Sequence, residues 1–185
     1  QIKSMSRQNF IVLGVSGSGK SSVAKNLSLY CNLNYVEADK FHSLTNKKKM
    51  AQGVALTESD RGPWLVRLIR FLKFKKQTHW VLACSALKAS HRKMLLNEFK
   101  NTSLIWLDSS YENIVTRINK RKNHFFSSKL IQSQFDTFEK PKMGFRIVTD
   151  KPLYRVKFDA RNKVKKIRKQ RSTNILKFRN NYPRF

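Results

Sequence analysis

A glycine- and serine-rich loop near the N-terminus constrains the fold of this chain more than any other feature. It reads Gly14-Val15-Ser16-Gly17-Ser18-Gly19-Lys20-Ser21 and matches the pattern G-x-x-x-x-G-K-[ST] at every fixed position. Residues 10–15 form a continuously apolar run, typical of a strand buried on both faces of a parallel sheet. Residues 21–31 favour a helix. This order predicts a phosphate site, and we call residues 14–21 the phosphate loop.

The chemistry of the phosphate loop predicts how a nucleoside triphosphate would bind. Glycines allow a tight turn in which successive N–H groups point at phosphate oxygens, and the next helix offers its positive end. Lys20 would reach the β- and γ-phosphates as a catalytic cation, and the Ser21 hydroxyl would bind Mg²⁺. The expected nucleotide contacts are Gly14, Ser16, Gly17, Ser18, Gly19, Lys20, Ser21 and Ser22. The loop does not indicate which molecule is the second substrate.

The rest of the chain alternates strand and helix patterns. Short apolar runs predict further strands at residues 33–38, 79–84, 103–107 and 145–149. Helix starts are predicted at Thr57, which begins a capping box, at Ser110, and at Ser127 or Ser128. A basic helix is predicted near residues 155–169. This alternation predicts an α/β fold with a parallel sheet.

Charge and composition limit the kinds of partner that this chain can be expected to have. The chain has 39 Lys and Arg against 11 Asp and Glu, a net charge of +28, and residues 140–185 carry 16 of the basic residues and two of the acidic ones. Such a surface attracts anions, but without a recognised nucleic-acid motif we expect no nucleic-acid partner. No apolar run reaches the length of about 20 residues that spans a bilayer, so we expect no membrane partner. Cys31 and Cys84 are interpreted as reduced thiols of a cytoplasmic protein.

Several further blocks carry a family resemblance. They are Ala38-Asp39-Lys40-Phe41-His42, Asn46-Lys47-Lys48-Lys49-Met50, Gly53, Leu56-Thr57, Asp60-Arg61-Gly62-Pro63-Trp64-Leu65, Ala83-Cys84-Ser85-Ala86-Leu87-Lys88, Arg92, Arg121-Lys122-Asn123-His124-Phe125 and Ser133-Gln134-Phe135. In this order, from about Phe10 to Pro141, they resemble the gluconokinase family of P-loop kinases. Asn123 stands where the family pattern has glycine, and beyond Pro141 the match weakens.

The resemblance implies a fold and a reaction. The fold would be that of a P-loop NTPase, a three-layer α/β/α arrangement with a five-stranded parallel sheet and a helical lid at about residues 117–128. One kinase domain would span residues 1–169, followed by a loose basic tail at 170–185. With ATP and Mg²⁺ the enzyme would convert D-gluconate to 6-phospho-D-gluconate. The family also implies a homodimer.

Candidate substrate residues follow from strand ends and from the resemblance. Asp39 follows the second predicted strand, where it could accept or orient the proton of the attacking hydroxyl; its alternatives are a turn cap or a role in holding Mg²⁺. His42 could hydrogen-bond a substrate hydroxyl. A basic group must hold the substrate carboxylate, and Arg61, Lys88 and Arg92 are the candidates. Arg61 could instead form an ion pair with Asp60 or Glu58 at the start of its helix. Trp64 is interpreted as a core residue.

The predicted lid carries two arginines and a histidine. Arg117 and Arg121 are four residues apart and therefore share a helix face, which could also be a solvated basic surface. By the resemblance, Arg117 would contact ATP, Arg121 would stabilise charge on the transferring phosphoryl group, and His124 would contact gluconate. Two alternatives stay open: another small-molecule kinase of the shikimate type, and a degenerate kinase whose basic C-terminal region binds nucleic acid.

Overall fold

The computed structural model describes the backbone of residues 8–74, 79–120 and 128–180, and the side chains of these ranges except Ser128 and residues 171–180. Its sheet has five parallel strands in the order β2-β3-β1-β4-β5. The strands are β1 (Asn9–Leu13), β2 (Asn34–Glu37), β3 (Trp80–Ala83), β4 (Thr102–Asp108) and β5 (Phe145–Val148). The sequence prediction of an α/β fold with a parallel sheet is confirmed, and each predicted strand overlaps an observed one.

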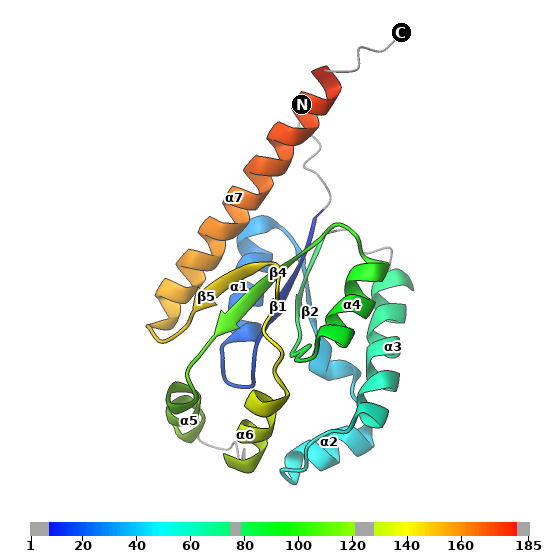
Figure 1. The fold of residues 1–185 in the computed structure, drawn as a ribbon, viewed down its shortest axis with the longest axis vertical. Coiled ribbons are helices and arrows are strands. Elements are labelled where there is room, and N and C mark those ends of the chain that lie inside the picture. Colours follow the sequence, from blue (N-terminus) through cyan, green and yellow to red (C-terminus); the bar gives the residue numbers. More distant parts are fainter. Residues whose placement is uncertain (1–7, 75–78, 121–127, 181–185) are drawn as a thin grey trace.

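Helices cover both faces of the sheet, which makes three layers (Figure 1). Helices α1 and α7 pack against one face and helices α3 and α4 against the other. The helical elements are α1 (Lys20–Cys31), η1 (Ala38–Phe41), α2 (Leu44–Ala51), α3 (Glu58–Phe74), α4 (Ala89–Glu98), α5 (Tyr111–Asn119), α6 (Ser128–Thr137) and α7 (Leu153–Asn180). In the part of the chain with known placement, no helix is both long enough and apolar enough to cross a membrane.

Strand β1 shows why its sequence is continuously apolar. Phe10 and Val12 pack into the core under α1 and α7, whereas Ile11 and Leu13 pack into the core under α3 and α4. All four side chains are fully buried. Because successive side chains of a strand point to opposite faces, a strand covered on both faces must be apolar at every position.

The predicted helix starts at Thr57 and Ser110 are observed. The Ser110 side chain accepts a hydrogen bond from the backbone N–H of Asn113 at the start of α5. At the start of α3, the backbone N–H of Asp60 donates to the Thr57 hydroxyl and the backbone N–H of Thr57 donates to the Asp60 carboxylate, a reciprocal capping box. The Lys49 ammonium and Thr57 lower the pKa of Asp60 to about 2.

Helix α7 extends beyond the helix predicted near residues 155–169. Its buried stripe is Val156, Ala160, Val164 and Ile167, so the predicted basic helix is confirmed and packs on the core. The backbone of residues 170–180 is helical as well. Between residues 153 and 180 the sequence contains neither glycine nor proline, and extending an existing helix is far easier than starting one.

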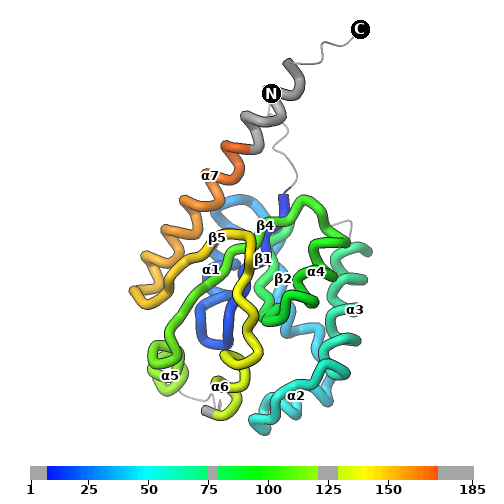
Figure 2. Tube along the Cα trace, in the orientation of Figure 1, coloured from blue at the N-terminus to red at the C-terminus, as the bar shows by residue number. Residues whose placement is uncertain are grey.

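The carboxyl ends of the parallel strands meet at one edge of the sheet. There the phosphate loop follows β1, and Asp39, Ser85, Ser109 and Thr149 follow the other strands. Figure 2 shows α2, α5 and α6 gathered around this edge. β1 lies between β3 and β4, so the strand order reverses beside the phosphate loop, the place where ligands bind in open α/β sheets.

Candidate active site

The phosphate loop has the geometry of an anion site. Gly14 permits close packing, since a Cβ there would lie 2.7 Å from the Leu107 carbonyl oxygen. Gly19, at the N-cap of α1, has a left-handed φ of 97°. Helix α1 has no acidic residue in its first turn and no side-chain cap, so its first N–H groups and positive end can receive an anion.

Two polar side chains in the phosphate loop are buried. The Lys20 ammonium folds back and donates to the Val15 carbonyl oxygen at 3.0 Å. The Ser18 hydroxyl is 1% exposed and has no hydrogen-bond partner among the described residues. A buried polar group without a hydrogen-bond partner is unfavourable. An anion bound in this loop could accept the hydrogen bond that the Ser18 hydroxyl lacks.

The surroundings of Ser21 fit a hard cation held mainly by phosphates. The hydroxyl of Tyr35 donates to the Glu37 carboxylate. Burial and the hydrogen bond to Glu37 raise the pKa of Tyr35, while a hydrogen bond with Ser21 opposes the change. The Tyr35 hydroxyl therefore lies beside the predicted ligand Ser21, and oxygen is the ligand atom that Mg²⁺ prefers. Within the described ranges, no three His, Cys, Asp or Glu side chains form a metal cluster.

A cavity of about 550 Å³ lies beside the phosphate loop, and we call it the Arg117 cavity. Its walls are Gly17, Gly19 and Ser22, helix α5, and the turn at residues 150–153 that follows β5. The Arg117 guanidinium donates to the backbone oxygens of Thr149 and Lys151 and so ties α5 to this turn. The volume is in the usual range for small-ligand sites. The structure thus brings Arg117 of α5 to the same cavity as three other predicted nucleotide contacts, Gly17, Gly19 and Ser22.

A second cavity, of about 100 Å³, includes Ser16 of the phosphate loop in its wall and is called the Asp39 cavity. It brings together three predicted substrate residues, Asp39, His42 and Arg61. The rest of its wall is Ser16, Met50, Ala55, Leu56, Trp64, Ser85, Leu87, Leu130, Ser133 and Gln134. The cavity is smaller than typical ligand sites, so a bound sugar acid would require its lining side chains to rearrange.

His42 is held as a neutral donor in the Asp39 cavity. Its ring stacks on Trp64 with centroids 4.6 Å apart and planes 10° apart. Burial, followed by the charges of Arg61, Arg67 and Lys47, lowers the pKa of His42 to about 4. The Asn46 amide lies 3.4 Å from Nδ1, so Nδ1 accepts and Nε2 carries the proton. Nε2 lies 4.0 Å from the Asp39 carboxylate.

Arg61 is oriented by its backbone contact and not by a neighbouring acid. Its Nε donates to the Leu56 carbonyl oxygen at 3.2 Å. The two acids that could have paired with it have other partners: Asp60 binds Lys49 at 2.8 Å, and Glu58 binds Lys88 at 3.2 Å and His91 at 2.9 Å. Arg61 thus lines the cavity without an acidic ion-pair partner among the described residues, and a guanidinium there can receive a carboxylate.

Lys88 and Arg92 lie outside the lining of the Asp39 cavity. Lys88 forms the ion pair with Glu58. The buried Arg92 guanidinium donates to the carbonyl oxygens of Ala86, Leu87 and Glu139, each at 2.8 Å. Ala86 has a left-handed φ of 38°, unfavourable for a residue with a side chain. Arg92 therefore stabilises the loop that places Ser85 and Leu87 on the cavity wall.

Other predicted residues have different outcomes. Trp64 is 2% exposed and donates from its ring N–H to the Ala38 carbonyl oxygen, so it belongs to the core and also lines the cavity. Arg121 and His124 lie outside the described residues, so their roles stay predictions. Gln134, whose amide contacts Ser16, was missed as a site residue; its presence in the block Ser133-Gln134-Phe135 was the available signal.

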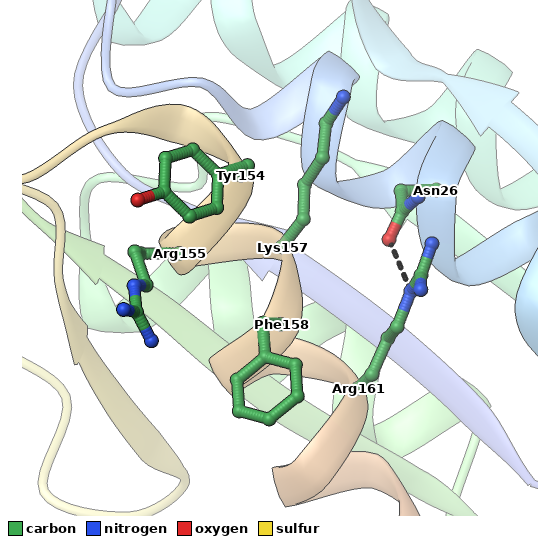
Figure 3. Close-up of a pocket in the computed structure, with 6 residues that line it drawn as sticks. All are labelled: Asn26, Tyr154, Arg155, Lys157, Phe158 and Arg161. Atoms are coloured by element: carbon green, nitrogen blue, oxygen red, sulfur yellow. Dashed lines mark hydrogen bonds between the residues drawn. The ribbon is translucent and has the colours of Figure 1, made fainter.

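A third cavity, of about 480 Å³, lies between α1 and α7 (Figure 3). Figure 3 shows Arg161 directed at Asn26, to which its Nε donates at 2.8 Å, and the rings of Tyr154 and Phe158 on successive turns of α7. The lining residues are Asn26, Tyr154, Arg155, Lys157, Phe158 and Arg161. None belongs to the phosphate loop or to the quoted motif blocks, so this cavity is not the candidate active site.

Comparison with known proteins agrees with this geometry. The shikimate kinase family model matches residues 16–144. The chain is 35% identical over 139 residues to the thermosensitive gluconokinase of Escherichia coli, covering 74% of each chain. It is 38% identical over 155 residues to a probable gluconokinase of Xenopus tropicalis, covering 75% of this chain and 82% of the relative.

Solved structures give the same result. A gluconokinase from Sinorhizobium meliloti superimposes with a TM-score of 0.83 and 30% identity, covering 91% of this chain and 97% of that one. A shikimate kinase from Bacteroides thetaiotaomicron, with a TM-score of 0.60 and 10% identity, shares the fold alone. The chain therefore belongs to the gluconokinase family, within the shikimate kinase-like P-loop kinases.

Proposed function

We propose that the protein transfers the γ-phosphoryl group of ATP to D-gluconate, giving 6-phospho-D-gluconate and ADP. The observation that carries this proposal is the Asp39 cavity, in which a carboxylate, a neutral histidine and an arginine lie next to Ser16 of the phosphate loop. A polyhydroxy acid needs these groups: hydrogen-bond partners for its hydroxyls and a cation for its carboxylate. The gluconokinases among its relatives support the same substrate.

Asp39 is the proposed partner of the attacking hydroxyl. It follows β2 at the carboxyl edge of the sheet, and its side chain is 60% exposed at the cavity, so it can reach a substrate. There it would orient the hydroxyl and accept its proton as the O–P bond forms. His42 would donate from Nε2 to a substrate oxygen, and Arg61 would bind the carboxylate with its terminal nitrogens.

The phosphate loop would bind and orient the donor. Lys20 and the first N–H groups of α1 would neutralise charge on the β- and γ-phosphates, and the nucleoside would occupy the Arg117 cavity. Ser21 would hold Mg²⁺, which when bound supplies positive charge between phosphate oxygens. Arg121 and His124 are proposed from the family pattern to act on the transferring phosphoryl group and on gluconate. A homodimer is likewise a proposal, to be tested by sedimentation.

Shikimate is the second candidate acceptor, because the matching family model is that of shikimate kinase. Both acids carry a carboxylate and hydroxyls, so Arg61 alone does not separate them. The identities of 35% and 38% to gluconokinases, against 10% to a solved shikimate kinase, favour gluconate.

Identification of the product tests the proposal. The protein would be incubated with ATP, Mg²⁺ and D-gluconate, and the product analysed by mass spectrometry and by phosphorus NMR for the position of the phosphate. We expect 6-phospho-D-gluconate from the wild type and none from Lys20→Ala, whose folding is checked by circular dichroism. A phosphorylated product made equally well by Lys20→Ala would refute the role of the phosphate loop.

A further inference from the structure

Gln134 of α6 makes a two-point contact with the phosphate loop. Its Oε1 accepts a hydrogen bond from the backbone N–H of Ser16 at 2.7 Å, and its Nε2 donates to the Ser16 hydroxyl at 3.0 Å. These residues are 118 positions apart in the chain. Gln134 also lines the Asp39 cavity. One side chain therefore contacts both the proposed acceptor site and the loop proposed to hold the donor.

The contact reaches Lys20 through a single peptide unit. The peptide unit between Val15 and Ser16 is hydrogen-bonded through both of its polar groups. Its N–H donates to Gln134, and its carbonyl oxygen accepts from the Lys20 ammonium at 3.0 Å. Because a peptide unit is planar, fixing the direction of its N–H also fixes the direction of its carbonyl oxygen. Hydrogen bonds in such a chain also polarise one another.

The amide of Gln134 has capacity beyond this contact. A carboxamide offers two N–H donors and two acceptor lone pairs, and Ser16 uses one of each. A substrate hydroxyl in the Asp39 cavity could use what remains. Gln132 on the same helix provides a comparison: it is exposed, and its amide binds Asp136 on the next turn of α6.

We propose that Gln134 is a positioning residue that orients the Val15–Ser16 peptide and, through it, the Lys20 ammonium. This inference rests on the proposed function, and it gives the wall of the acceptor site a direct role in placing the lysine that neutralises the transferring phosphoryl group. Misplacement of a catalytic group by about 1 Å can lower a rate on the order of 100-fold. Loss of Gln134 is therefore expected to lower turnover more than nucleotide affinity.

The test compares four variants. Gln134→Met keeps the side-chain volume and removes the hydrogen bonds, and Gln134→Ala is the second variant in case the first does not fold. Ser16→Ala removes only the hydroxyl contact and keeps the backbone N–H bond. Gln132→Ala is the control on the same helix. For each, kcat, KM for ATP and KM for the acceptor are measured, with urea denaturation to confirm folding.

We expect Gln134→Met to lower kcat by about 10- to 100-fold, with KM for ATP changing less than about threefold. Ser16→Ala should lower kcat much less, and Gln132→Ala should have the kcat of the wild type. A kcat of Gln134→Met near the wild-type value would overturn the proposal. A change confined to KM for the acceptor would also overturn it, because Gln134 would then be a substrate ligand only. Loss of folding in both Gln134 variants would overturn it as well, because the role of Gln134 would then be structural.

The acceptor used is the one that the wild type phosphorylates fastest among gluconate and shikimate. If shikimate is phosphorylated and gluconate is not, the proposed function is refuted, and the Gln134 variants can still be compared with shikimate as the acceptor. If neither acceptor is phosphorylated, the slow hydrolysis of ATP by water serves for the same comparison. The two proposals can therefore fail separately.

Discussion

Replacement of Arg61 by methionine should selectively weaken the binding of gluconate. The Nε of Arg61 donates to the Leu56 carbonyl oxygen, and Arg61 lines the Asp39 cavity. A hydrogen bond between charged groups contributes about 1.5–3 kcal/mol. Two parallel bonds to one carboxylate overlap in their effect, so we take about 3 kcal/mol for the pair. At about 1.4 kcal/mol per tenfold change, KM for gluconate should rise on the order of 100-fold.

The assay is ADP release at saturating ATP over a range of gluconate concentrations. Arg61→Lys keeps the charge and loses the planar fork, so its KM should fall between those of the wild type and Arg61→Met. Arg70→Met is the matched control, because Arg70 is an exposed arginine on the same helix and lies outside the cavity lining. A folded Arg61→Met variant with a KM for gluconate within about threefold of the wild type would refute the carboxylate assignment.

Three further predictions concern neighbouring residues. Asp39→Asn should lower kcat by about 10²–10⁴-fold while ADP affinity, measured by calorimetry, stays constant; an unchanged kcat would remove Asp39 from catalysis. Arg92→Met should lower the free energy of unfolding by about 3 kcal/mol in urea denaturation, because three backbone oxygens lose their donor; an unchanged midpoint would contradict this. The free energy of unfolding of the wild type should fall as the pH falls from 6.5 toward about 4, since the unfolded state protonates His42 before the folded state does. His42→Gln should lack that part of the slope, and parallel pH curves would contradict it.

The elements that could be predicted from the sequence are those with a local cause. Phe10 to Leu13 are apolar at every position because helices cover both faces of β1, and this pattern is visible without the fold. Ser110 begins α5 because its side chain reaches a backbone N–H three residues later. Asp39 was placed at the site because residues after parallel strands gather at one edge of the sheet.

The elements that could not be predicted depend on distant partners. The sequence predicts a substrate contact for Arg92 and gives no sign of its structural contacts: its guanidinium binds the Glu139 carbonyl oxygen, 47 residues away, and two carbonyl oxygens of its own loop. The contact between Ser16 and Gln134 likewise joins segments that only the folded sheet brings together. The end of α7 could not be predicted either, because the sequence has no clear periodicity after residue 170, whereas the helix continues to Asn180.

The choice of acceptor decides whether this kinase is a gluconokinase. Initial rates of ADP release would be measured with ATP and Mg²⁺ and, in separate reactions, D-gluconate, shikimate, AMP and a short oligonucleotide. We expect gluconate-dependent release of ADP that the other three compounds do not produce and that Lys20→Ala abolishes. Release that depends on shikimate or AMP would keep the kinase and contradict gluconate as the substrate, and folded protein inactive with every compound would contradict the proposed activity.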